Sequence, residues 1–442
     1  MGGEWKRTSL REAGVTLIDC DHRTPPAADS GYPYVAIPQL KEGRLSLGDV
    51  RRISPEHFVE WTRKAKPQHH DVILSRRCNP GETAYVPAGL DCALGQNLVL
   101  LRADGTKLFP PFLRWLVRGT DWWEQVGTFI NVGAVFDSLR CADIPNFKMP
   151  LPPIAEQEAI AAVLGALDDK IELNRRMNAT LEAMARALFQ SWFVDFDPVR
   201  AKLDGRPPLG LDQATAALFP EHLQETALGH TPQGWEVHSL DKIAHYLNGL
   251  ALQKYPPGDG PTLPVIKIAQ LRKGDAVGAD RCNTDLPTAY IVQDGDVLFS
   301  WSGSLEVELW CGGPGALNQH LFKVTSPEFP KWFYYLWTLY HLDEFRLIAA
   351  GKATTMGHIQ RGHLTAAKVL VPTRSLLDAM SRTMTPLIDK IIANRIQSRT
   401  LATLRDTLLP KLLSGELRVR GLEKAILGDG QRELDCGARM QP

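Results

Sequence analysis

The stretch that decides the fold runs from residue 152 to residue 192 and reads PPIAEQEAIAAVLGALDDKIELNRRMNATLEAMARALFQSW. The prolines at its start are tolerated in a first helical turn, and Gly165 is the only helix breaker after them. Its apolar residues recur in steps of three and four, the heptad spacing of a long helix that packs against another helix. These residues are Ile160, Leu164, Leu167, Ile171, Leu181, Leu188 and Trp192. Asn174 and Asn178 occupy two positions of the same seam, so we expect a long helix with a polar interruption near its middle.

The same seam recurs 220 residues further along the chain, where it is formed by Met380, Met384, Leu387, Ile391, Leu401, Leu408 and Leu412. The polar interruption recurs with it, because Asn394 matches Asn174 and Ser398 matches Asn178. Shared residue types in two amphipathic helices could explain part of this match. The single offset also aligns residues 109–188 with residues 329–408, which reaches well upstream of the helices, so we infer an internal duplication. The simplest closed arrangement of the two copies is antiparallel, with Asn174 close to Asn394.

Four short segments before the first helix have counterparts before the second. WKRTSL at 5–10 matches WEVHSL at 235–240, PYVAIPQL at 33–40 matches PVIKIAQL at 264–271, DVILS at 71–75 matches DVLFS at 296–300, and GQNLV at 95–99 matches NQHLF at 318–322. The offset drifts between these anchors, which indicates a shared scaffold of short strands with loops of different length. One aromatic helix is expected at the end of each globular region, at 109–123 and 329–345.

The predicted fold class is α+β, with two pseudo-symmetric globular domains separated by two long antiparallel coiled-coil-like helices. The expected boundaries are a first globular domain at 1–150, a central long helix at 151–194, a linker at 195–230, a second globular domain at 231–372, a distal long helix at 373–416, and a disordered tail at 417–442. The linker is rich in Pro and Gly and shows no clear periodicity.

Composition excludes several classes of protein. The 442 residues contain 44% hydrophobic and 23% charged residues, as in ordinary globular proteins. No apolar run approaches the roughly 18 residues that span a bilayer. The first residues lack the apolar core of a signal peptide, and seven Cys without a C-x-x-C pattern argue against a disulfide framework or a zinc module. We therefore expect a cytoplasmic protein without membrane contact and without a metal.

A search for catalytic motifs finds no coherent set. The chain has no G-x-x-x-x-G-K-[ST] phosphate loop and no G-x-G-x-x-G after a predicted strand. The sequence NPG at 79–81 lacks the aromatic residue of an amino-methyltransferase motif. The two copies also share no combination of acid, base and nucleophile that would mark a catalytic site. We therefore expect no catalytic residues in this chain.

The two copies do share amide, hydroxyl and basic side chains at strand ends. Gln and Asn can pair with adenine through two hydrogen bonds, Arg can pair with guanine, and hydroxyl or basic groups suit phosphates. The candidate DNA contacts are Gln39, Ser75, Arg76, Arg77, Gln96 and Asn97 in the first copy, and Lys267, Gln270, Arg272, Ser300, Trp301, Asn318, Gln319 and His320 in the second. The alternative for each residue is that it caps a turn or ties loops together.

Several segments resemble the specificity (S) subunits of type I restriction-modification systems. These segments are GDVLFS at 295–300, ALNQHLFKV at 316–324, LPPIAEQ at 151–157, SWFVDF at 191–196 and LLPKLLSGEL at 408–417. Their order and the duplication carry the resemblance over nearly all of residues 4–417. The first copy departs from the second where it has LGQN at 94–97 instead of LNQH at 317–320.

The resemblance implies two target-recognition domains, each recognising one half of a bipartite double-stranded DNA sequence, and two long helices that dock two modification (methyltransferase) subunits. Such a subunit directs adenine methylation and, together with restriction (translocase/nuclease) subunits, ATP-dependent cleavage. S-adenosylmethionine, ATP and Mg are then expected on the partner subunits and no cofactor on this chain. Two alternatives are a structural connector that does not bind DNA and a fused methyltransferase or nuclease, which the missing motifs disfavour.

Overall fold

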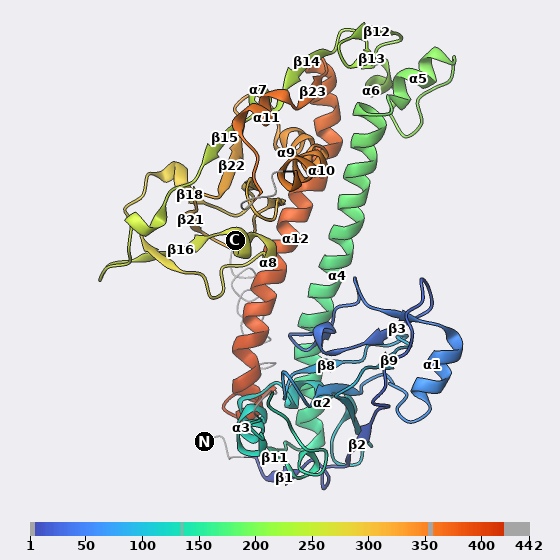
Figure 1. Ribbon diagram of the computed structural model, residues 1–442, viewed down its shortest axis with the longest axis vertical. Coiled ribbons are helices and arrows are strands. Elements are labelled where there is room, and N and C mark those ends of the chain that lie inside the picture. Colours follow the sequence, from blue (N-terminus) through green and yellow to red (C-terminus); the bar gives the residue numbers. More distant parts are fainter. Residues whose placement is uncertain (1–4, 134–135, 352–356, 420–442) are drawn as a thin grey trace, which may run out of the picture. The chain divides into compact units, whose positions relative to one another are not determined.

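The computed structural model describes residues 5–133, 136–351 and 357–419 of the chain. It divides into unit 1, Met1–Asp169 with Leu401–Pro442, and unit 2, Lys170–Thr400. Both long helices, α4 (Ile154–Phe193) and α12 (Arg374–Ser414), run from one unit into the other. Each unit therefore combines one globular region with part of both helices (Figure 1).

The long helices begin and end where backbone chemistry dictates. Helix α4 starts directly after the Pro152-Pro153 pair and is 40 residues long, and α12 is 41 residues long and continues through Pro386. Gly415 ends α12 with a positive φ of 77°, a left-handed conformation that Gly adopts without penalty. The N–H of Leu417 then donates to the carbonyl oxygen of Lys411 at 3.0 Å. This bond satisfies a carbonyl that the helix end leaves open.

Unit 1 is built on an antiparallel four-stranded sheet in the order β2 (Val15–Asp19), β10 (Leu98–Ala103), β7 (Val72–Ser75), β8 (Thr83–Tyr85). A second sheet has the order β6 (Arg52–Ile53), β3 (Tyr32–Val35), β9 (Ala93–Leu94), and its β3–β9 pair is parallel. Smaller pairs are β1 (Arg7–Ser9) with β11 (Lys148–Pro150) and β4 (Leu40–Lys41) with β5 (Arg44–Leu45). The other helices are η1 (Ile37–Gln39), α1 (Pro55–Thr62), α2 (Pro110–Leu116), α3 (Thr120–Phe129) and η2 (Ile144–Asn146).

Unit 2 repeats this plan. Its antiparallel sheet has the order β15 (His245–Asn248), β22 (Leu321–Thr325), β19 (Val297–Ser300), β20 (Val307–Leu309). The second sheet has the order β17 (Arg281–Asn283), β16 (Thr262–Ile266), β21 (Gly315–Leu317), β18 (Ile291–Val292), and its β16–β21 pair is parallel. Strand β14 (Glu236–Ser239) pairs with β23 (Lys368–Val371) as β1 pairs with β11. The helices of its globular region are α7 (Leu240–Ile243), η3 (Leu252–Lys254), α8 (Ile268–Lys273), η4 (Thr288–Tyr290), α9 (Lys331–Tyr340), α10 (Leu342–Ala350) and α11 (Arg361–Ala366).

Strand register shows that the sequence repeat is a structural repeat. Leu98 lies opposite Ser75 in unit 1, and Leu321 lies opposite Ser300 in unit 2. These are the residue pairs that the aligned segments at 71–75 and 95–99 match to 296–300 and 318–322. The α+β class is therefore built twice from the same order of elements.

Three features differ from the sequence-based expectation. Each aromatic segment forms two short helices instead of one, α2 and α3 in unit 1 and α9 and α10 in unit 2. The expected linker contains helices α5 (Asp197–Leu203) and α6 (Gln213–Leu218) and the hairpin of β12 (Leu223–Thr226) and β13 (Gly229–Pro232). Residues 417–419 of the expected tail are folded, since Val419 is buried in the core of unit 1, and residues 420–442 lie outside the described part of the chain.

Within each unit the two long helices lie side by side in opposite directions (Figure 1). In unit 1 the globular region packs on Ile160, Leu164 and Leu412, and in unit 2 it packs on Trp192, Met380 and Met384. These are positions of the predicted seam. The seam therefore holds each globular region as well as the partner helix.

The polar interruption of the seam is buried in unit 2, where Asn174, Asn178 and Asn394 are each less than 8% exposed. The amide of Asn394 donates to Oδ1 of Asn178 at 2.9 Å. The amide of Asn174 lies 2.9 Å from Oε1 of Gln397, 3.3 Å from Oγ of Ser398 and 3.4 Å from the main-chain oxygen of Asn394. Asn174 and Asn394 thus meet through the main chain, and the direct pair of asparagine side chains joins Asn178 to Asn394.

Candidate nucleic-acid interface

Three strand ends converge at one edge of each globular region. Because β3 and β9 are parallel, the residues that follow them emerge at the same edge, and these include Gln39 and Gln96. The parallel pair of β16 and β21 likewise brings out Gln270 and Gln319. The segments that follow β7 in unit 1 and β19 in unit 2 lie at the same edge. Both strands are buried inner strands of their four-stranded sheets.

Equivalent main-chain hydrogen bonds hold the third strand end in place. The N–H of Arg76, after β7, donates to the carbonyl oxygen of Asn97 at 2.8 Å. The N–H of Trp301, after β19, donates to the carbonyl oxygen of His320 at 3.3 Å. The structure therefore gathers candidates that are far apart in the sequence onto one surface of each unit. Their contact with DNA stays a prediction.

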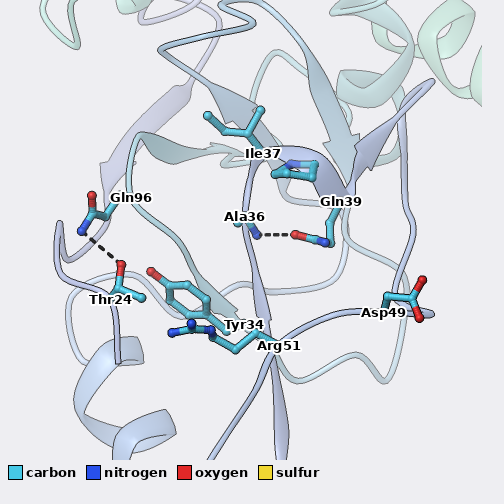
Figure 2. A pocket seen from close by; sticks show the side chains of 9 residues that line it. Thr24, Tyr34, Ala36, Ile37, Gln39, Asp49, Arg51 and Gln96 are labelled. Atoms are coloured by element: carbon cyan, nitrogen blue, oxygen red, sulfur yellow. Dashed lines mark hydrogen bonds between the residues drawn. The ribbon is translucent and has the colours of Figure 1, made fainter. Parts of the chain in front are cut away.

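In unit 1 this edge forms a pocket of about 410 Å³. Figure 2 shows Gln39 and Gln96 on different sides of it, with Tyr34 and Arg51 between them. The remaining lining residues are Thr24, Ala36, Ile37, Pro38 and Asp49. Such a pocket combines an aromatic ring, two amides and charged groups of both signs, which suits a planar, polar ligand group.

The two matched glutamines keep the same local role. Oε1 of Gln39 accepts a hydrogen bond from the N–H of Ala36 at 3.1 Å, and Oε1 of Gln270 accepts one from the N–H of Lys267 at 3.3 Å. Each glutamine thus caps the turn that follows its strand, as the alternative interpretation proposed. The cap uses the carbonyl oxygen of each side chain and leaves its NH₂ group as a donor for a ligand.

The other candidates of unit 1 differ in accessibility. Gln96 is exposed and its amide donates to Oγ1 of Thr24 at 3.2 Å. Asn97 adopts a left-handed φ of 67°, which Asn tolerates better than most residues. Arg76 is partly buried, with Nη1 3.4 Å from the carbonyl oxygen of Leu139. Arg77 is exposed, and its guanidinium lies 5.5 Å from the centre of the Phe136 ring.

In unit 2 the accessible candidates form a basic and aromatic set. Arg272 is exposed on α8, and Lys267 forms an ion pair with Asp280. The ring of Trp301 lies 5.9 Å from that of His320, centre to centre. The indole N–H of Trp301 donates to Oδ1 of Asn248 at 2.9 Å, and Gln319 is partly exposed beside it.

Three predicted contacts lie in the interior. Ser75 and Ser300 are each 0% exposed, and their hydroxyl groups donate to the carbonyl oxygens of Arg77 and Ser304 at 2.9 and 2.6 Å. Asn318 is 4% exposed, and its Oδ1 accepts from the N–H of His320 at 3.3 Å. All three side chains shape the loops beside them and have no surface to offer DNA.

Sequence analysis missed Thr24, Tyr34 and Arg51 as lining residues of the pocket. Tyr34 lies within the matched segment at 33–40, but its partner in unit 2 is Val265, so the repeat gave no polar signal. The hydroxyl of Tyr34 donates to the carbonyl oxygen of Arg23 at 3.1 Å, and burial raises the pKa of Tyr34. Arg51 is exposed and donates to the carbonyl oxygen of Pro25 at 2.9 Å.

A group of potential metal ligands, Asp19, Cys20 and His22, lies near the pocket, with its ligand atoms within 4.8 Å of one another. The Cys20 thiol donates to the carbonyl oxygen of Gly95 at 3.2 Å, and burial raises the pKa of Cys20 to about 11. A metal binds the thiolate, which this environment opposes. The thiol serves here as a support for the residue that precedes Gln96.

Comparison with known proteins shows which proteins the chain resembles. Residues 22–183 match the family described as the type I restriction modification DNA specificity domain. The MjaIX specificity subunit, from a type I restriction enzyme of Methanocaldococcus jannaschii, is 27% identical over 402 residues, covering 89% of this chain and 86% of the relative. Residues 22–183 thus match a type I DNA specificity domain, and most of the chain is similar to specificity subunits of type I restriction enzymes.

Two further proteins are similar to this chain over most of its length. The HindI specificity subunit of a type I restriction enzyme of Haemophilus influenzae is 25% identical over 410 residues, which cover 78% of this chain and 86% of the relative. The crystal structure of the type I S subunit from M. genitalium shares the fold, with a TM-score of 0.52 at 15% identity. That match covers 92% of this chain and 96% of the other. None of the described helices has the length and apolar character needed to cross a membrane.

Proposed function

We propose that this chain is a type I specificity subunit that binds a bipartite double-stranded DNA target, with each unit recognising one half. The observation that carries the proposal is the repeated edge at the ends of β3 and β9 in unit 1 and of β16 and β21 in unit 2. Each edge presents a pair of glutamines from two different strand ends, Gln39 with Gln96 and Gln270 with Gln319. Two amides on one surface suit the donor and acceptor pattern of adenine in the major groove.

The remaining side chains at the two edges differ, so two different half-sites are expected. Unit 1 adds Arg51, Arg77 and Asn97, whereas unit 2 adds Lys267, Arg272 and His320. Arginine favours guanine, and lysine and arginine also contact phosphates. A chain with zero formal net charge can bind DNA in this way because the basic groups are placed locally.

The subunit performs recognition without catalysis, and its partners supply the chemistry. In this proposal two modification subunits dock on the long helices and methylate adenine with S-adenosylmethionine. Restriction subunits then cleave unmethylated DNA with ATP and Mg. The similarity to specificity subunits of type I restriction enzymes supports this part of the proposal.

The test is reconstitution of the chain with the modification subunits of its host, followed by sequencing of methylated positions in genomic DNA. We expect methylated adenines in a split motif. Replacing residues 5–150 with the matching segment of a relative should change one half of the motif only. A contiguous motif, or a replacement that alters both halves, would refute independent recognition.

A further inference from the structure

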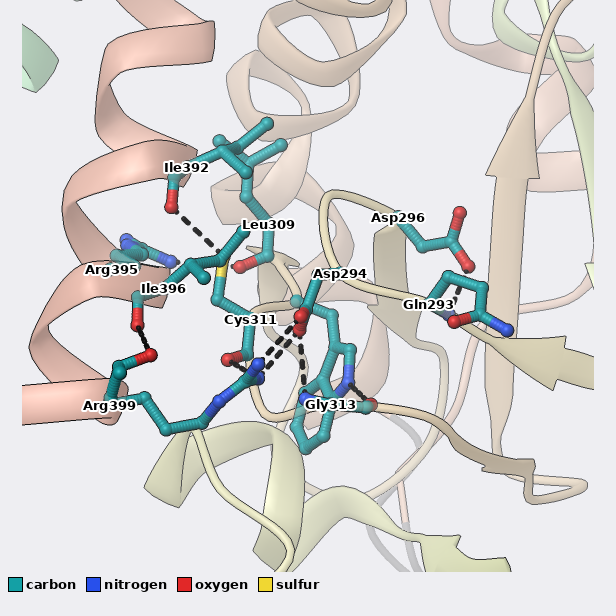
Figure 3. A network of polar contacts seen from close by, with 12 residues as sticks. Gln293, Asp294, Asp296, Leu309, Cys311, Gly313, Ile392, Arg395, Ile396 and Arg399 are labelled. Atoms are coloured by element: carbon teal, nitrogen blue, oxygen red, sulfur yellow. Dashed lines mark hydrogen bonds and ion pairs between the residues drawn. The ribbon is translucent and has the colours of Figure 1, made fainter. Parts of the chain in front are cut away.

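Two arginines of α12 attach the long helix directly to the globular region of unit 2 (Figure 3). Arg399 donates to both carboxylate oxygens of Asp294 at 2.7 Å and to the carbonyl oxygen of Cys311. A guanidinium that binds both oxygens of a carboxylate fixes orientation as well as distance. This hydrogen bonding also holds the pKa of Asp294 below its usual range, so the carboxylate is ionised at neutral pH.

Arg395 lies one turn earlier and binds three acceptors. It donates to Oε2 of Glu308 and to the carbonyl oxygen of Leu309, both at 3.0 Å. It also donates to Oε1 of Glu182 on α4 at 2.9 Å. A single guanidinium therefore joins both long helices to strand β20.

Together the two arginines immobilise the segment 308–313. Arg395 holds Glu308 and Leu309 at its start, and Arg399 holds Cys311. Asp294, which Arg399 binds, accepts a further hydrogen bond from the N–H of Gly313 at 2.8 Å. Figure 3 shows Arg399 beside Asp294, Cys311 and Gly313, and Arg395 beside Leu309.

This segment leads directly into the candidate DNA surface. Strand β21 begins at Gly315, and the recognition candidates Gln319 and His320 follow its end. Strand β21 also pairs in parallel with β16, whose end carries Lys267 and Gln270. A shift of the segment would therefore move both strand ends relative to the helix.

The duplicated half lacks this attachment at the equivalent positions. Arg395 corresponds to Arg175, which pairs with Glu172 three residues earlier on its own helix, and Arg399 corresponds to Ala179. Strand register places Ala84 where unit 2 has Glu308, since Ala84 lies opposite Ile73 and Glu308 lies opposite Leu298. The arginine attachment is thus specific to unit 2.

We propose that Arg395 and Arg399 are positioning residues for the DNA-recognition surface of unit 2. They set the discrimination between sequences in one half-site by fixing the strand ends that carry Gln270 and Gln319, without touching DNA themselves. This inference rests on the proposed bipartite recognition. It assigns a role in sequence specificity to two residues of α12. Their contacts are not repeated at the equivalent positions of α4, so they are not part of the packing that both halves share.

The test uses the complete methyltransferase complex, with the chain carrying Arg399→Gln or Arg395→Gln. Methylation kcat/KM is measured on the native site and on sites with single base-pair changes in either half. We expect discrimination in the half-site of unit 2 to fall about tenfold, the scale of one good base contact, and discrimination in the other half-site to stay unchanged. Arg175→Gln is the matched control, because this repeat-equivalent arginine pairs with Glu172 of its own helix, and it should change neither ratio.

Other outcomes are equally decisive. Unchanged ratios for Arg395→Gln and Arg399→Gln, or an equal fall in both half-sites, would overturn the positioning role. If Arg399→Gln prevents assembly, Arg399→Lys replaces it, because Lys keeps the charge but cannot bind both carboxylate oxygens in the same way. Arg399→Lys should also reduce discrimination in the half-site of unit 2 alone, by a smaller factor. Absence of a split motif with the unaltered chain would instead refute the proposed function on which the inference rests.

Discussion

A buried carboxylate on α4 holds together the elements of unit 1. Asp168 is 8% exposed and binds three guanidinium groups. Its oxygens lie 2.6 Å from Arg405 of α12, 2.8 Å from Arg44 of β5 and 3.2 Å from Arg114 of α2. One side chain thus connects both long helices to the globular region, so its replacement should destabilise unit 1 as a whole.

The size of the effect follows from which partners remain buried. Asp168→Ile removes the buried carboxylate partner of Arg405, which is itself 8% exposed and keeps only its contact with the exposed Asp406 at 2.8 Å. Breaking a buried pair in this way costs about 3–5 kcal/mol. The repeat supplies an apolar solution, because Asp168 corresponds to Ile388 and Arg405 to Ala185, and both of these residues are buried in unit 2. Adding Arg405→Ala should therefore recover about half of the loss, with the remainder due to Arg44 and Arg114.

Thermal unfolding and hydrogen exchange of the purified chain measure this prediction. At about 2–4 °C per kcal/mol for a unit of this size, the single variant should melt roughly 6–20 °C lower. Amides of unit 1 should lose protection while those of unit 2 keep theirs. The reasoning fails if the Asp168→Ile transition stays within about 2 °C of the original, or if the double variant is no more stable than the single one.

Three further predictions concern other contacts. Gln39→Ala and Gln96→Ala should each reduce discrimination in the half-site of unit 1 by about 1–3 kcal/mol, measured as methylation rates on altered sites, and normal rates would make both residues structural. Asn394→Leu should lower the free energy of unfolding by about 1–3 kcal/mol, measured with denaturant, because Oδ1 of Asn178 loses its buried donor. Changing both Asn178 and Asn394 to Leu should cost less, because no unpaired acceptor of this pair is then left. Burial opposes ionisation of Asp168, but Arg44 and the other arginines outweigh it and hold the pKa of this carboxyl below its usual range. The contribution of Asp168 to the stability of unit 1 should therefore be complete above the unfolded pKa of about 3.9 and be lost as pH falls further. If the melting temperature of Asp168→Ile falls with acid in the same way as that of the unaltered chain, this prediction is wrong.

The sequence by itself determined the duplication, the long helices and the identity of the matched strands. Heptad spacing is a property of neighbouring turns, so Ile160, Leu164 and Trp192 reveal the helix without knowledge of what covers them. The segments 71–75 and 296–300 could be predicted to form equivalent strands, because duplicated sequences that still align adopt the same local structure. The convergence of Gln39 with Gln96 depends on the parallel register of β3 and β9, which had to be observed.

Only the tertiary structure decided which polar side chains face solvent. Ser75, Ser300 and Asn318 resemble surface residues in the sequence, but neighbouring loops offer them main-chain partners that no local pattern encodes. The arginine contacts of Arg399 and Arg405 depend in the same way on carboxylates more than 100 residues away in the chain. Burial of a charged group is favourable only when its partner arrives from elsewhere in the fold, and for that physical reason the attachments of the helices to the two globular regions could not be derived from periodicity or from the repeat.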